Sequence, residues 1–110
     1  MAQPHAEPGE IVSVRPLGAQ LSEATSTAIL KASQLEIIRV VLPAGKTMRE
    51  HHTPGEITVQ CLEGMVEFET DGKTQKMQAG DLIHLAPRAR HALKALENAS
   101  LLLTICLLPG

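Results

Sequence analysis

Hydrophobic residues along the chain fall in short segments of four to eight residues, separated mostly by glycine, proline, serine or aspartate. Short apolar segments with frequent turn residues are typical of β-strands, and no segment carries the apolar spacing of even a three-turn helix. Strands are therefore predicted at Ile11–Val14, Thr27–Ala32, Leu35–Leu42, Ile57–Leu62, Met65–Thr70, Thr74–Gln78, Asp81–Leu85, His91–Leu96 and Leu101–Leu108. This pattern predicts an all-β fold.

The clearest hairpin lies in the stretch "MVEFETDGKTQKMQ", residues 65–78. Val66 and Phe68 alternate with two glutamates, which predicts one buried and one solvated face. The pair Asp71-Gly72 follows, and both residue types tolerate the positive φ angles of a type I′ turn. We therefore expect two adjacent antiparallel strands joined at Asp71-Gly72.

The 110 residues are 44% hydrophobic, which suits one domain with a modest core. Residues 1–10 are predicted to form a flexible arm, and residues 11–110 a single domain. Lys and Arg total 10 against 12 Asp and Glu, and the basic residues are scattered, which argues against a nucleic-acid groove. No apolar run approaches the roughly 18 residues of a membrane span, so we expect a soluble, cytoplasmic protein.

Few residues in the sequence suggest chemistry. Cys61 and Cys106 lie inside apolar runs, where we expect reduced, buried thiols rather than a disulfide or a catalytic nucleophile. Phe68 is the single aromatic residue, so the chain lacks a stacking platform for nucleobases. The stretch "REHHTPGE", residues 49–56, combines adjacent histidines with carboxylates. These are common ligands of transition metals, which makes this stretch the leading candidate for a site.

Three phrases of the sequence resemble those of small single-domain cupins of the RmlC-like type: "LPAGKTMREHH", "VQCLEGMVEFETDGK" and "MQAGDLIHLAPRARHAL". The similarity covers residues 35–108 and includes the spacing from Gly45 to His51 and the position of Gly80 ahead of His91. Membership of this family implies a double-stranded antiparallel β-barrel, related to the jelly roll. It also implies a metal at the mouth of the barrel, held by three histidines and one glutamate.

Carried over by position, the resemblance makes His51 and His91 metal ligands. The second histidine of the family's motif falls on Thr53 and its glutamate on Ile57, so the family's four-ligand set is incomplete. The loss of the carboxylate lowers the negative charge of the site and should weaken its hold on a divalent ion.

Strand alternation decides which other residues could join this site. Ile57, Val59 and Cys61 share one face of their strand, and Thr58 and Gln60 share the other. The apolar face is expected to line the core. Gln60 is then either an outward-facing polar residue or, through its amide oxygen, a further metal ligand.

A second strand register remains open. A one-residue bulge before Gly64 would turn Glu50, His52 and Glu56 toward the interior instead, and bulges are frequent near functional sites. In that register His52 and Glu56 become metal ligands and keep the histidine-to-glutamate spacing of the family. The sequence alone does not choose between the two registers.

The resemblance to cupins implies metal-assisted chemistry on a small molecule, as a dioxygenase, isomerase or lyase, with Fe, Mn, Ni, Cu or Zn as the metal. His84, in the apolar strand "DLIHL", is either a proton donor or acceptor that lines the pocket or a core histidine bonded to backbone. The alternative is a non-catalytic binding or sensor barrel, whose histidines bind a carboxylate or sugar without metal. No residue pattern names a substrate.

Two strands are apolar on both faces, "EIIRVVL" and "LLLTICLL". One face enters the core, and the other would leave an apolar patch in water unless something covers it. We therefore expect a homodimer in which Leu102, Thr104 or Cys106 contributes to the interface, with the N-terminal arm as a candidate to cross to the partner. Small cupins commonly dimerise, so the resemblance implies the same.

Overall fold

The computed structural model of the protein describes residues 5–51 and 53–108, apart from the side chains of residues 50 and 51. These residues form one short 3-10 helix and nine strands: η1 (Gly18–Glu23), β1 (Thr27–Lys31), β2 (Leu35–Leu42), β3 (Thr47–His51), β4 (Ile57–Glu63), β5 (Met65–Thr70), β6 (Lys73–Gln78), β7 (Leu82–Leu85), β8 (His91–Ala95) and β9 (Ala99–Cys106). No helix among the described residues is long and apolar enough to span a membrane.

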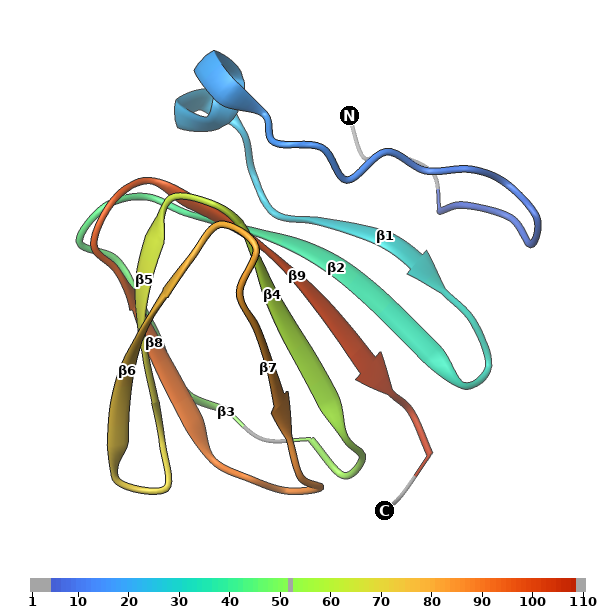
Figure 1. Ribbon diagram of the computed structural model, residues 1–110. Coiled ribbons are helices and arrows are strands. Elements are labelled where there is room, and N and C mark those ends of the chain that lie inside the picture. The colour runs from blue at the N-terminus through green and yellow to red at the C-terminus, as the bar shows by residue number, and fades with distance from the viewer. Residues whose placement is uncertain (1–4, 52, 109–110) are drawn as a thin grey trace.

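The strands form two antiparallel sheets that face each other (Figure 1). One sheet has five strands in the order β1-β2-β9-β4-β7, and the other has four in the order β3-β8-β5-β6. The predicted all-β, jelly-roll-like fold is confirmed. Across the described residues the two sheets stay separate ladders instead of closing into one continuous barrel.

Most of the predicted strands are confirmed within a few residues, but two segments differ. Ile11–Val14 is not a strand, because this segment crosses the outside of the five-stranded sheet without a ladder partner. β3 was not predicted, because Met48 is its single apolar residue and leaves no alternation to detect. β3 is an edge strand, where polar side chains are common.

The predicted hairpin is present as β5 and β6, which pair from Met65 opposite Gln78 to Thr70 opposite Lys73. At the turn, φ is 52° for Asp71 and 74° for Gly72. Positive φ at both central residues is the signature of the type I′ turn. The hairpin fixes the register of β5, and thereby positions Phe68 on the inner face.

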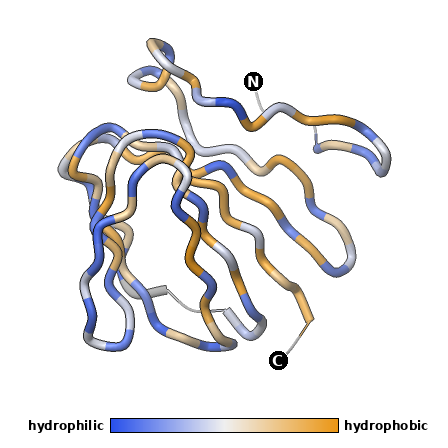
Figure 2. The backbone as a smooth tube through the Cα atoms, viewed as in Figure 1, coloured by the Kyte–Doolittle hydropathy of each residue, from blue (hydrophilic) through white to orange (hydrophobic). Residues whose placement is uncertain are grey.

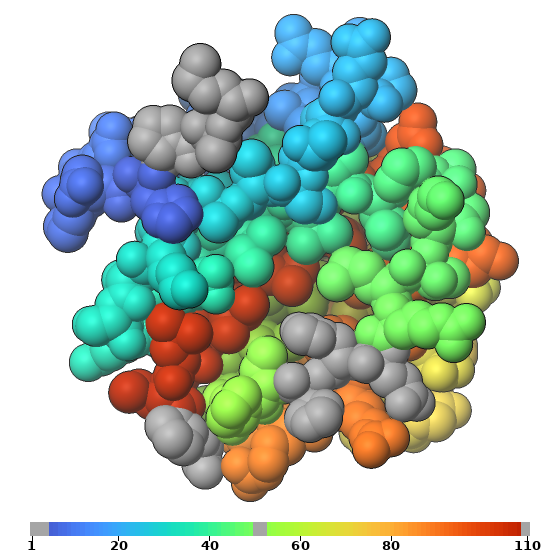
Figure 3. Space-filling model, turned by 180° about the vertical axis from the view of Figure 1, so that it is seen from behind, coloured from blue at the N-terminus to red at the C-terminus, as the bar shows by residue number. Residues whose placement is uncertain are grey.

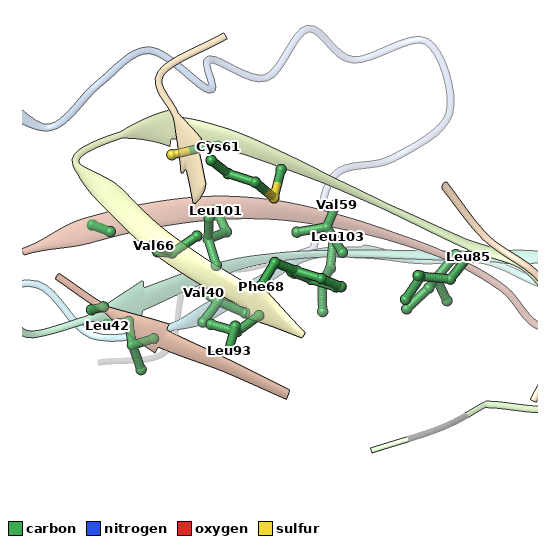
Figure 4. Packing of buried hydrophobic residues seen from close by; sticks show 14 of the residues in the cluster. Val40, Leu42, Val59, Cys61, Val66, Phe68, Leu85, Leu93, Leu101 and Leu103 are labelled. Carbon is green, nitrogen blue, oxygen red and sulfur yellow. The ribbon is translucent and has the colours of Figure 1, made fainter. Parts of the chain in front are cut away.

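The core lies between the two sheets and is built by strand alternation. In β4 the burial of Ile57, Val59 and Cys61 alternates with partial exposure of Thr58 and Gln60, as predicted. Side chains from both sheets meet in this layer (Figure 4), and Phe68 is fully buried at its centre. Strand hydropathy follows burial: β9, which is largely buried, is mainly apolar, and β6, which is largely exposed, is mainly polar (Figure 2).

The segment before β1 runs along the outer side of the five-stranded sheet (Figure 3). Its anchor is the Glu63 carboxylate, which accepts hydrogen bonds from the backbone N–H groups of Leu17 (2.9 Å) and Gly18 (3.1 Å) and from the Ser100 hydroxyl (2.5 Å). The buried Arg39 guanidinium donates to the Arg15 carbonyl oxygen at 2.9 Å. These contacts cover one end of the sheet's outer face.

Candidate functional site

His91 begins β8 and is the central residue of the candidate site. Its side chain is 3% exposed, because the alternation of β8 directs His91, Leu93 and Ala95 to the interior. The imidazole stacks on the ring of Phe68, with centroids 5.6 Å apart and planes 5° from parallel. Stacked rings at this distance are favourable, so Phe68 fixes the plane of the imidazole.

His51 ends β3 and lies directly opposite His91 in the ladder between β3 and β8. A bulge precedes it, since two residues, Arg49 and Glu50, face Ala92 alone between the Met48 and His51 pairings. Residues at opposite ladder positions have Cβ atoms about 5 Å apart. The predicted contact between the His51 and His91 nitrogens concerns a side chain outside the described residues, as does the predicted role of His52, and both stay predictions.

The positions of the family's other two ligands carry no imidazole or carboxylate. Ile57 is 4% exposed and belongs to the hydrophobic core. Thr53 is partly buried, and its hydroxyl donates to the Gly55 carbonyl oxygen at 3.0 Å. Among the described side chains, no group of three or more His, Cys, Asp or Glu could hold a metal ion. These residues do not fit a site of three histidines and one glutamate.

Glu56 and His84 lie together on the outside of the protein. The His84 Nε2 atom is 2.6 Å from Glu56 Oε1, and both side chains are 58% exposed. His84 was expected either to line the pocket or to lie in the core, and it does neither, because the alternation of β7 turns Leu85 inward and His84 outward.

The bulged register also fails to bring Glu56 inward. The ladder between β4 and β9 is irregular between Cys61 and Glu63, just before Gly64. Ile57 nevertheless faces the core, and the exposed Glu56 precedes it. An irregularity at the far end of β4 leaves the start of this strand in register, so it cannot reorient Glu56.

Gln60 lies on the outer face of β4, opposite Leu82 of β7 and Leu102 of β9. The core side of the strand is formed by its neighbours Val59 and Cys61, which are fully buried. Gln60 and His91 therefore belong to opposite sides of the five-stranded sheet, and the structure does not bring them together. The outward-facing alternative for Gln60 agrees with this burial pattern.

Sequence reasoning missed two features of this region. Phe68 was noted as the single aromatic residue but not as the ring that stacks on His91; its place in the Val66–Phe68 alternation was the available signal. The cluster around Glu63 was also missed. Its signal was the presence of two opposite charges, Arg39 and Glu63, in strands that are mainly apolar.

The local environment shifts two titrating groups. Burial alone would raise the pKa of the Glu63 carboxyl group, but its three hydrogen bonds and the nearby Arg39 guanidinium lower the pKa below its usual value. Burial raises the pKa of the Cys61 thiol, which donates to the carbonyl oxygens of Glu63 at 3.5 Å and Gly64 at 3.7 Å. A buried thiol of raised pKa is a poor nucleophile. Both cysteines are free, but only Cys61 is buried as predicted, because Cys106 lies on the outer side of β9 and is partly exposed.

Comparison with solved structures shows the same fold in several bacterial proteins. A cupin superfamily protein from Desulfitobacterium hafniense has 16% sequence identity and a TM-score of 0.76, over 93% of this chain and 99% of that one. A conserved protein of unknown function from Streptococcus pyogenes has 21% identity and a TM-score of 0.74, over 100% and 97%. An RmlC-like cupin from Desulfovibrio desulfuricans has 21% identity and a TM-score of 0.74, over 89% and 98%.

At these identities the similarity shows a common fold and no shared activity. No curated protein matches the sequence. The model of the cupin domain family matches residues 38–107, which include every strand from β3 to β9 and most of β2. The chain therefore belongs to the cupin domain family.

Proposed function

We propose that this cupin binds a small molecule between its two sheets, at the end where β3 stops and β8 begins, with His91 as the main polar contact. The observation that carries the proposal is the burial of His91. Three described polar or charged residues are buried, and two of them, Arg39 and Ser100, belong to the contacts of the N-terminal segment. His91 is the remaining one, and it faces the apolar interior.

The chemistry around His91 defines a class of ligand. An imidazole donates or accepts a hydrogen bond, and its Phe68 neighbour and the core residues Ile57 and Leu85 offer apolar surface. Sites for small molecules commonly combine such an apolar lining with one or two polar groups. The ligand is then a compact molecule with an apolar body and a carboxylate or hydroxyl group. His51, opposite His91 in the ladder, supplies the second polar position.

Binding of short carboxylic acids tests this proposal. We expect the affinity to rise from acetate to hexanoate, as more apolar surface is buried, and the backbone amides around residue 91 to shift in NMR spectra. His91→Phe keeps a flat ring against Phe68 but removes both nitrogens, and should weaken hexanoate binding at least tenfold. His84→Gln is the matched control, because this histidine lies on the outer surface. Equal hexanoate binding by His91→Phe and the unaltered protein would contradict the proposal.

A divalent metal is the second candidate, and the ladder position of His51 opposite His91 favours it. Two imidazoles suit Fe, Mn, Ni, Cu or Zn, and open coordination positions would provide Lewis-acid or redox chemistry for a dioxygenase, isomerase or lyase. Elemental analysis of protein purified without chelating resin tests this candidate. Bound metal that is lost in His91→Phe and kept in His84→Gln supports it, and a metal content below 0.1 per chain (roughly the level of adventitious binding) argues against it.

We also propose a homodimer formed through the outer face of the five-stranded sheet. Leu82 of β7 is 64% exposed there, and Leu102, Thr104 and Cys106 of β9 are partly exposed on the same face, with β4 between the two strands. The end of the chain adds further apolar surface at Leu107 and Leu108. A two-fold pairing would cover this surface in both copies. The expected result in solution is about twice the chain's mass of 11.8 kDa.

A further inference from the structure

The four-stranded sheet carries a hollow of about 560 Å³ that residues of all four strands line. Its polar and charged lining includes Thr47, Arg49, Glu67, Glu69 and Lys94. The members on β5 and β8 alternate with the buried residues Phe68 and Leu93, so these side chains point away from the core. The hollow is therefore a different place from the interior site at His91. Its size is in the range that holds small ligands.

The two glutamates of this hollow, Glu67 and Glu69, differ in the charge of their neighbours. Glu67 lies between Lys94 of β8 and Lys76 of β6 at directly opposite ladder positions, where unlike charges attract. Glu69, two residues further along β5, faces Thr74 and Ala92 instead. Both neighbours are neutral, so Glu69 has no opposite charge at a facing ladder position, and neither glutamate forms an ion pair within 4 Å with a side chain that the structure describes.

A cation lies on the other side of Ala92. The bulge in β3 sets Arg49 and Glu50 against Ala92 alone, and Arg49 is exposed on the outer side of the strand. Like Glu69, Arg49 forms no ion pair within 4 Å with a described side chain. Because β8 separates β3 from β5, the two backbones are about 10 Å apart. Arg49 and Glu69 thus flank the small methyl group of Ala92 from opposite sides.

We propose that this hollow binds a free amino acid, whose carboxylate is held by Arg49 and whose ammonium group is held by Glu69. A guanidinium binds a carboxylate through two parallel hydrogen bonds, and a carboxylate accepts from an ammonium group in the same charge-assisted way. The small side chain of Ala92 leaves room for the ligand between them. A simple anion would use one side of the hollow and a simple amine the other, so the pairing of opposite charges selects the zwitterion.

L-Leucine, N-acetyl-L-leucine and L-leucinamide separate these contacts, since the second lacks the ammonium group and the third lacks the carboxylate. We expect L-leucine, titrated into the labelled protein to about 20 mM, to shift the NMR signals of the backbone amides of residues 49, 69 and 92. Each analogue should bind at least tenfold more weakly than L-leucine, because a charged group of the hollow then lacks its partner. Equal affinity for all three ligands overturns the proposal.

Variants of the two charged residues complete the test. Arg49→Gln and Glu69→Gln should each reduce the affinity for L-leucine at least tenfold, and both positions are exposed, so the fold should be kept. Lys31→Gln and Glu23→Gln are matched controls, because they remove exposed charges on other elements and should leave the affinity unchanged. The proposal is wrong if L-leucine binds Arg49→Gln and Glu69→Gln as tightly as it binds the controls. It is also wrong if L-leucine shifts no backbone amide signal of the residues that line the hollow. Hexanoate binding at His91 is independent of either outcome.

Discussion

His84 and His91 lie on strands of similar length, yet their imidazoles meet opposite environments. His91 is directed inward with Leu93 and Ala95, and its ring stacks on Phe68. His84 is directed outward, and its partner is the carboxylate of Glu56. The face of the strand, rather than the residue type, therefore decides which histidine can contact a ligand in the interior. For the same reason His84 is the natural control for every experiment on His91.

Gly64 is the residue whose replacement should disturb the fold most directly. Its φ is +83°, and a Cβ atom added there would lie 2.2 Å from the Asn98 carbonyl oxygen and 2.8 Å from the Cα of Ala99. Gly64→Ala therefore combines backbone strain with a collision against the backbone before β9. We expect the free energy of unfolding to fall by roughly 2–4 kcal/mol, measured by urea denaturation.

A substitution at Gly80 separates the effect of backbone strain from that of the steric collision. Its φ is +96°, but a Cβ atom there would meet nothing within 4 Å. Gly80→Ala should thus carry the backbone strain alone, at about 1–2 kcal/mol. If the two alanine variants lose equal stability, the close approach at Gly64 contributes nothing, and the account of its collision is wrong.

Single residues also show what the sequence could tell about the site. The alternation of Ile57, Val59 and Cys61 identified the core face of β4, because polar residues stand between them. No such contrast exists around His84, whose neighbour Leu82 is 64% exposed although it is a leucine. An apolar residue on an outer face breaks the relation between hydropathy and burial on which the prediction depends. The sequence therefore could not predict whether His84 points inward or outward.

At the scale of elements, the N-terminal segment is held to the sheet by one carboxylate. Glu63, at the end of β4, accepts hydrogen bonds from two backbone N–H groups before η1 and from Ser100 of β9. Its contacts join residues 46 and 45 positions apart in the sequence, as well as two neighbouring strands. Protonation of this carboxyl group should consequently loosen the segment and the sheet together.

The stability of the protein should fall in acid because of Glu63. Its pKa is lowered in the folded protein, so the folded state binds this proton less readily than the unfolded chain does. The stabilisation is complete above the pKa of the unfolded carboxyl group, near 4.5, and is lost as the pH falls through the lower folded value. Glu63→Gln should reduce the free energy of unfolding by about 1–3 kcal/mol at pH 7 and by less at pH 3.

Urea denaturation at both pH values measures this difference. Glu97→Gln is the control, because Glu97 is exposed and its carboxylate makes no hydrogen bond with a described residue. An equal loss of stability in Glu63→Gln at pH 7 and pH 3 would mean that the charge of Glu63 has no part in holding the N-terminal segment.

Tertiary contacts explain why the predicted strand at Ile11–Val14 is absent and why β3 was not predicted. Ile11–Val14 has the composition of a strand, but its chain is held by contacts of Arg15 and Leu17 with side chains of the sheet, not by a ladder. β3 has the opposite character, with one apolar residue and a ladder partner in β8. Tertiary contacts decide both cases, and local sequence patterns do not contain them.

At the scale of the whole molecule, the two outer faces differ in character. The outer face of the four-stranded sheet presents charged side chains such as Glu67, Glu69 and Lys94. The outer face of the five-stranded sheet presents the exposed Leu82 and the partly exposed Leu102, and the N-terminal segment contacts this face at Arg39 and Glu63. Apolar surface gathered on one side of a small protein favours association, because burial of this surface removes it from water.

Charged substitutions on this face should convert the proposed dimer into a monomer. Leu82→Lys is the first variant, since Leu82 is exposed in the single chain and its loss should leave the fold intact. Leu102→Lys is the second, because Leu102 lies between β2 and β4 near the middle of the sheet. Light scattering at about 50 μM should give twice 11.8 kDa for the unaltered protein and 11.8 kDa for each variant, since a buried unpaired charge opposes pairing.

Leu96→Lys is the matched control, because Leu96 is 37% exposed and follows β8 in the other sheet. It removes a leucine and adds a charge as the test variants do, so its mass should stay at that of the dimer. A monomeric mass for the unaltered protein would refute the dimer itself. A dimer that survives both Leu82→Lys and Leu102→Lys would instead place the interface elsewhere, and the apolar outer face would then need another explanation.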